Sequence, residues 1–97
     1  MRRAEYKVKG GKLIKCRLEL DNNYIKHVTY TGDFFLHPEE SVEELERNLV
    51  GAKASKDEIE RIISGFFRNP RVTLIGASPQ DFISVTSFCI EGSINGS

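Results

Sequence analysis

Apolar and polar residues alternate along the first third of the chain, which is typical of β-strands with one buried face. Tyr6 and Val8 alternate with lysines, and the alternation from Ile14 to Asp21 is the most regular in the sequence. The segment from Tyr24 to Thr31 is rich in β-branched and aromatic residues, and it predicts a third strand. The pattern therefore predicts three consecutive strands.

Short turn sequences separate these strands. Gly10-Gly11 is typical of a two-residue hairpin, because both glycines accept positive φ, and Asp21-Asn22-Asn23 supplies short side chains that tolerate the same geometry. Strands joined by such short turns are antiparallel neighbours, so we expect a meander. Its third strand loses the alternation near Ile25 and Lys26, which indicates a bulge.

Helical periodicity replaces the alternation in the middle of the chain. Ser41-x-x-Glu44 and Ser55-x-x-Glu58 are capping-box sequences, each followed by apolar residues at helical spacing. Gly51 follows the first helix where a C′ glycine is expected. The second helix has the strongest periodicity, and it carries five apolar residues at i, i+3, i+4, i+7 and i+8: Ile59, Ile62, Ile63, Phe66 and Phe67.

A third helix is expected after Ser78-Pro79, where serine can cap and proline fits the first helical position, and Gly92 should end it. The segment from Arg71 to Ile75 is extended and allows a short fourth strand. The sum is an α+β fold, an antiparallel three-stranded meander covered on one face by about three helices. We expect a single domain over residues 1–92 and a loose tail over residues 93–97.

The charges are balanced in total but not along the chain. There are 14 Lys and Arg against 14 Asp and Glu, yet residues 1–27 carry eight bases and three acids, whereas residues 28–60 carry three bases and nine acids. Helix capping accounts for acids in the middle third. The polar face of the meander is mostly basic and is either a solvated surface or a face for an anionic group; its residues are Glu5, Lys7, Lys9, Lys15, Arg17 and Glu19.

The sequence carries no motif of a self-sufficient enzyme. It has no phosphate-binding glycine loop, and His27 and His37 lack metal-ligand spacing, so we expect neither a catalytic residue nor a metal site. Cys16 and Cys89 are far apart and lie in apolar periodic stretches, which predicts two buried thiols and a cytoplasmic chain. No apolar run is long enough to span a membrane.

Two adjacent phenylalanines at the end of the third strand stand out. Successive side chains of an extended segment diverge, so Phe34 and Phe35 cannot both point into one core. Either one of them wraps under the first helix, or an aromatic ring faces outward and marks a partner site. We therefore take Gly32, Asp33, Phe34 and Phe35 as a candidate partner interface.

From Lys7 to Phe67 the sequence resembles the C-terminal, or accessory, domain of lipoate–protein ligases. The most specific part is Gly32-Asp33-Phe34-Phe35 followed by a helix with Leu45, Leu49 and Gly51. The other matching segments are Lys9-Gly10-Gly11-Lys12-Leu13-Ile14, the Asp21 to Ile25 turn, Val42 to Gly51, and the helix with Ile59 and Ile62-Ile63.

This resemblance implies an accessory subunit without catalytic residues of its own. The Arg-Arg-x-Ser-Gly-Gly-Gly and His-Asp-x-Gly-Asn motifs of the large domain are absent, so the catalytic domain would be a separate chain. Lipoate, ATP and Mg are implied for the complex and not for this chain alone. The pair would activate lipoate to lipoyl-adenylate and transfer it to a lysine of an acceptor protein.

The alternative is a stand-alone module that binds nucleic acid or another anion through the basic meander. Its bases lie among Tyr6, Tyr24 and Tyr30, and such surfaces can stack single strands, although no RNP-type motif is present. Under this alternative the isolated chain would bind oligonucleotides in a salt-dependent way.

Overall fold

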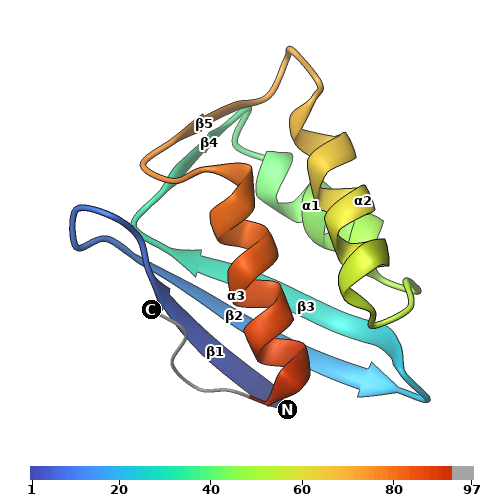
Figure 1. Ribbon diagram of the computed structural model, residues 1–97. Coiled ribbons are helices and arrows are strands. Elements are labelled where there is room, and N and C mark those ends of the chain that lie inside the picture. Colours follow the sequence, from blue (N-terminus) through green and yellow to red (C-terminus); the bar gives the residue numbers. More distant parts are fainter. Residues whose placement is uncertain (93–97) are drawn as a thin grey trace.

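A computed structural model describes residues 1–92, and the predicted tail at residues 93–97 lies outside the described residues (Figure 1). The elements in chain order are β1 (Arg2–Lys7), β2 (Leu13–Asp21), β3 (Tyr24–Gly32), β4 (Phe35–His37), α1 (Ser41–Leu49), α2 (Lys56–Phe67), β5 (Thr73–Ile75) and α3 (Pro79–Glu91). The α+β class is confirmed.

Strands β1, β2 and β3 form the predicted antiparallel meander in that spatial order. The register shifts between Glu19, which pairs with His27, and Leu20, which pairs with Ile25, so the expected bulge is present. The first turn is one residue longer than predicted. The Val8 amide donates to the Lys12 carbonyl at 2.7 Å, and the loop that this bond closes contains Lys9, Gly10 and Gly11.

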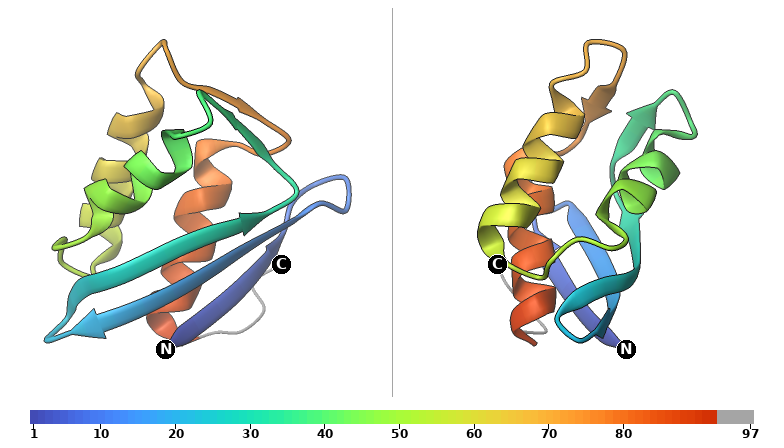
Figure 2. Two further views of the ribbon diagram at one scale, coloured as in Figure 1. Left: turned by 180° about the vertical axis from the view of Figure 1, so that it is seen from behind. Right: turned by 90° about the vertical axis from the view of Figure 1, so that its right-hand side faces the viewer.

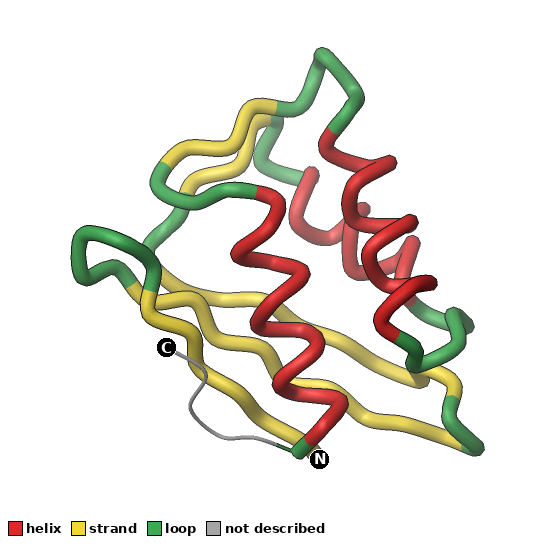
Figure 3. The backbone as a smooth tube through the Cα atoms, viewed as in Figure 1, coloured by secondary structure: helices red, strands yellow, loops and turns green. Residues whose placement is uncertain are grey.

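The short strand after α2 exists, but it does not extend the meander. It is β5, and it pairs with β4 in a separate two-stranded sheet (Figure 3). The chain leaves β3 at Gly32, whose φ is 143°, and a Cβ there would lie 2.2 Å from the Leu13 carbonyl oxygen. Only glycine fits this turn, and it redirects the chain toward β4.

The outer edge of β3 is covered by α1 and the loop that follows it. The Ile25 amide donates to the Ala52 carbonyl at 2.8 Å, and the Gly51 amide donates to the Ile25 carbonyl at 2.7 Å. Farther along, the Tyr30 amide donates to Glu46 Oε2 at 2.8 Å. Three of the backbone groups that a further strand would need, on Ile25 and Tyr30, are therefore already paired.

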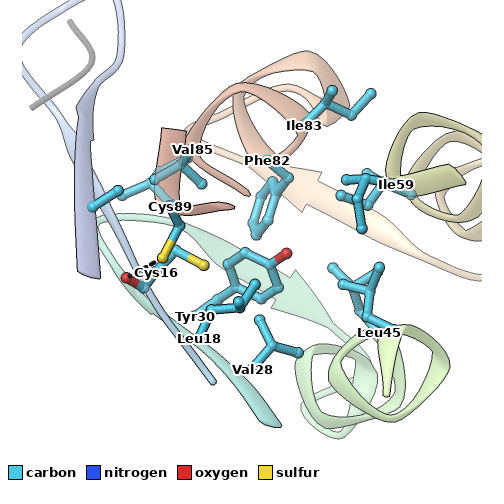
Figure 4. Packing of buried hydrophobic residues seen from close by; sticks show 14 of the residues in the cluster. Cys16, Leu18, Val28, Tyr30, Leu45, Ile59, Phe82, Ile83, Val85 and Cys89 are labelled. Carbon is cyan, nitrogen blue, oxygen red and sulfur yellow. Dashed lines mark hydrogen bonds between the residues drawn. The ribbon is translucent and has the colours of Figure 1, made fainter. Parts of the chain in front are cut away.

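Helix α3 lies across β1 and β2, and α2 packs against α3 and α1 (Figures 1 and 2). The core between them includes Leu18, Leu45, Ile59 and Phe82, each fully buried (Figure 4). One polar link crosses it: the hydroxyls of Tyr30 and Thr86 lie 2.5 Å apart, and Thr86 donates to the Phe82 carbonyl.

The three helix starts differ from one another. Ser78 and Asp81 form a full capping box on α3. Ser55 caps α2, accepting from the Glu58 amide at 3.3 Å. The predicted box at Ser41 is wrong: α1 has Glu40 at the N-cap with no side-chain bond, and Ser41 is its first helical residue, almost fully buried. The Ser41 amide donates to the Pro38 carbonyl, so the chain ahead of α1 takes the place of the cap.

Loss of the Ser55 cap should have a measurable cost. Ser55→Ala is expected to lower the free energy of unfolding by about 1 kcal/mol, because the Glu58 amide loses its acceptor. Chemical denaturation followed by circular dichroism measures it. Ser55→Asp is the control, since aspartate caps as well as serine; equal losses in both variants would contradict the role of the cap.

Candidate functional site

Phe34 and Phe35 point to opposite sides, as the sequence predicts. The Phe34 ring packs edge-on to Phe82 with ring centroids 5.0 Å apart, so Phe34 belongs to the core. Phe35 is 67% exposed. Of the two phenylalanines, only Phe35 offers its ring to a partner.

Phe35 and Ile75 are cross-strand partners of β4 and β5, and no pattern in the sequence predicts this pairing. Ile75 is 52% exposed, whereas Leu36, the next residue of β4, points to the other side of the ribbon and is buried. The pair forms an apolar patch on the outer side of the β4–β5 ribbon. This patch forms because β4 and β5, which are far apart in sequence, pair in this register. No local sequence motif indicates that pairing.

Gly32 and Asp33 position the ribbon and contribute little apolar surface. Asp33 accepts the Leu13 amide through Oδ2 at 3.2 Å, and its own amide donates to the Leu13 carbonyl at 2.8 Å. Directly after β5, Gly76 has a φ of 93°, and a Cβ there would lie 3.0 Å from the Asp33 carbonyl oxygen. These close approaches fix the ribbon beside the end of β3 and the start of β2.

The polar face of the meander is solvent-accessible. Lys7, Lys15 and Arg17 are exposed on it, as expected, and Lys9 is instead in the turn after β1. Arg3 joins the face as the direct cross-strand partner of Arg17, and Thr29 and Thr31 continue it on β3. Alternation along β1 places Arg3 on this face, although Arg3 is missing from the residues that we predicted for it from the sequence.

Two of the three tyrosines, Tyr6 and Tyr30, lie on the opposite, core-facing side of the sheet. Tyr6 stacks on Phe88 of α3 with centroids 5.9 Å apart, and Tyr30 is buried edge-on to Phe82 at 5.2 Å. Tyr24 is exposed, but it lies at the far end of β3. Since base stacking needs aromatic rings beside the charges, the stand-alone nucleic-acid alternative lacks its platform in the described sheet.

Cys16 and Cys89 are both buried, as predicted, and remain free thiols. The Cys89 thiol donates to the Cys16 carbonyl at 3.5 Å, and the two sulfur atoms lie next to each other (Figure 4). The hydrogen bond with Cys89, together with burial, raises the pKa of Cys16 far above its ordinary value, so this thiol stays protonated at neutral pH. An inert, protonated thiol is a packing residue and no nucleophile.

Two other pKa shifts also follow from burial. Desolvation raises the pKa of Tyr30 well above its ordinary value, and desolvation likewise raises the pKa of Glu46, against the bond from the Tyr30 amide. Both groups hold elements of the core together. Within residues 1–92, no three His, Cys, Asp or Glu side chains gather in a way that could hold a metal ion. Over the same residues, no helix is long and apolar enough to cross a membrane.

Comparison with known proteins identifies a family. Residues 2–85 match the model of the bacterial lipoate protein ligase C-terminus, which extends the resemblance beyond α2 into α3. The chain is 44% identical over 78 residues to lipoate-protein ligase A subunit 2 of Thermoplasma acidophilum, covering 80% of this chain and 79% of that one.

A solved structure shows the same fold. It comes from work on a bipartite lipoate protein ligase and its E2 lipoyl domain from Thermoplasma acidophilum, and the matched chain is 37% identical with a TM-score of 0.78. The match covers 89% of this chain and 94% of that one. Sequence, family model and structure agree: this chain belongs to the family of bacterial lipoate protein ligase C-terminal domains.

Proposed function

We propose that this chain is the small, accessory subunit of a two-chain lipoate–protein ligase. The observation that carries the proposal is the 44% identity, over four-fifths of the chain, to a protein named as the second subunit of such a ligase. The solved relative comes from a bipartite ligase, which supports a separate catalytic chain. The partner is therefore a catalytic large subunit, in a heterodimer.

In this proposal the reaction takes place on the partner. The catalytic subunit holds lipoate, ATP and Mg, forms lipoyl-adenylate and transfers the lipoyl group to a lysine of an acceptor protein. The accessory chain supports the adenylation step by closing over the site, since closure excludes water from a reactive acyl-adenylate. Two buried free thiols suit the cytoplasm, and we place the complex there.

The surface that we assign to the catalytic subunit is the patch of Phe35 and Ile75, with Gly32 and Asp33 holding it in place and Phe34 anchoring it to the core. An exposed aromatic ring beside an exposed aliphatic side chain is typical of the centre of a protein interface. Both lie on one short ribbon whose opposite side, at Leu36, is buried in the core. A partner would thus contact a ribbon that already packs against the core.

Lipoate-dependent exchange of pyrophosphate with ATP tests the function. The catalytic subunit should exchange slowly alone and faster when this chain is added, with the increase saturating at one chain per catalytic subunit. Transfer from preformed lipoyl-adenylate to an acceptor should depend less on this chain. An exchange rate that does not change on addition would rule out the adenylation role, and separate elution of the two chains at micromolar concentration would rule out the subunit role.

A further inference from the structure

Arg3 on β1 and Arg17 on β2 face each other across the meander. They are register partners in the antiparallel pair, both are exposed, and they lie on the face opposite the core. Like charges directly opposite each other in a sheet are destabilising. Two guanidinium groups in this position therefore raise the question of what offsets their repulsion.

The neighbouring acids are engaged elsewhere. Glu5 Oε2 lies 3.9 Å from Lys15 Nζ, and Glu19 Oε2 lies 3.5 Å from Lys26 Nζ. Among the described residues, no ion pair includes Arg3 or Arg17; the remaining pair joins Arg61 and Glu58 on α2. The arginine pair thus keeps its full positive charge toward solvent.

The surroundings of the pair favour a small anion. Thr29 is the register partner of Arg17 on β3, and Thr31 lies one step along the same face, so two hydroxyl groups border the charges. The four side chains help to line a shallow depression of about 350 Å³. Glu5 and Lys15, which pair with each other, also line it, so the depression keeps the net positive charge of the two arginines. Arginine forks donate two parallel hydrogen bonds to one oxyanion, and hydroxyls add further donors.

We propose that this depression binds a phosphate-type oxyanion, held by Arg3 and Arg17 from two strands and by the Thr29 hydroxyl. The oxyanion can come from inorganic polyphosphate or from the triphosphate of a nucleotide, which share the recognised group. The site is built from this chain alone. It can therefore fail without affecting the proposed subunit function, and it can hold if that function fails.

Isothermal titration calorimetry of the full chain with tripolyphosphate, ATP and AMP tests the site. Tripolyphosphate and ATP should bind at one per chain with similar affinity, and AMP should bind more weakly. Tighter binding of ATP assigns the natural source to a nucleotide. Arg3→Ala/Arg17→Ala should weaken tripolyphosphate binding by about tenfold or more, because two charge-assisted contacts are lost.

The matched control is Arg68→Ala/Arg71→Ala, which removes the same charge from exposed positions after α2. Its affinity should stay close to that of the unmodified chain. Arg3→Lys/Arg17→Lys should recover only part of the lost affinity, since lysine keeps the positive charge but cannot donate two parallel hydrogen bonds to one oxyanion. The proposal is overturned if tripolyphosphate does not bind, if both alanine pairs weaken it equally, if the lysine pair binds like the unmodified chain, or if an oligoglutamate peptide binds as tightly as tripolyphosphate.

Discussion

Replacing Phe82 with alanine is expected to lower the free energy of unfolding by about 3–5 kcal/mol. Phe82 is fully buried at the centre of an aromatic cluster, with ring centroids 5.2 Å from Tyr30, 5.0 Å from Phe34 and 5.3 Å from Phe67. These rings come from β3, from the segment before β4 and from α2. The substitution leaves a cavity where these elements meet α3, and the rigid neighbours can fill it only in part.

Thermal unfolding followed by circular dichroism measures this loss. A domain of this size loses roughly 4 °C or more of melting temperature per kcal/mol, so the midpoint should fall by more than about 12 °C. Phe82→Leu keeps most of the volume and should cost less than about 1.5 kcal/mol. Phe35→Ala is the matched control on an exposed ring, and it should change stability by no more than about 0.5 kcal/mol. Similar losses for Phe82→Ala and Phe35→Ala would disprove the assignment of Phe82 as the centre of the core.

Phe35→Asp is expected to weaken binding to the catalytic subunit on the order of a hundredfold while the fold stays intact. Truncation of an interface hot spot costs about 2 kcal/mol or more, and a carboxylate buried against Ile75 and an apolar partner surface adds a desolvation cost. The predicted effect is therefore on association and not on stability. Titration calorimetry of the two chains gives the affinity, and the melting temperature of the isolated variant checks its fold.

Tyr24→Asp is the control for this prediction. Tyr24 is also an exposed aromatic residue, at 51%, but it begins β3 at the end away from the β4–β5 ribbon. The Tyr24 variant should bind the catalytic subunit as the unmodified chain does. Equal weakening by both substitutions, or undiminished binding by Phe35→Asp, would show that the ribbon is not the interface.

Local patterns were sufficient to predict most of the fold. The alternation around Cys16 determines which face of β2 is buried, the periodicity around Ile59 determines which face of α2 is buried, and Ser78-Pro79 marks the start of α3. Each of these signals depends on residues a few positions apart. The divergence of Phe34 and Phe35 follows from the geometry of an extended chain and was predictable for the same reason.

Features that depend on distant partners were not predictable in this way. The pairing of β4 with β5 joins residues 35–37 to residues 73–75, and it creates the patch of Phe35 and Ile75. The cap expected at Ser41 is absent because α1 begins one residue earlier than predicted, with Glu40 at the N-cap. The Ser41 amide donates to the Pro38 carbonyl there. Lys9 lies in the turn and not on the basic face, because the turn is one residue longer than Gly10-Gly11 predicts. Only tertiary packing selects among such local options.

The covered edge of β3 matters for a protein made apart from its partner. An open strand edge is a template for aggregation, and a subunit that waits for its partner is exposed to this hazard for longer than a domain joined to it. Here Glu46, Gly51 and Ala52 already bind backbone groups of Ile25 and Tyr30 at that edge. This edge of the small subunit is thereby protected against pairing with a strand of a second chain.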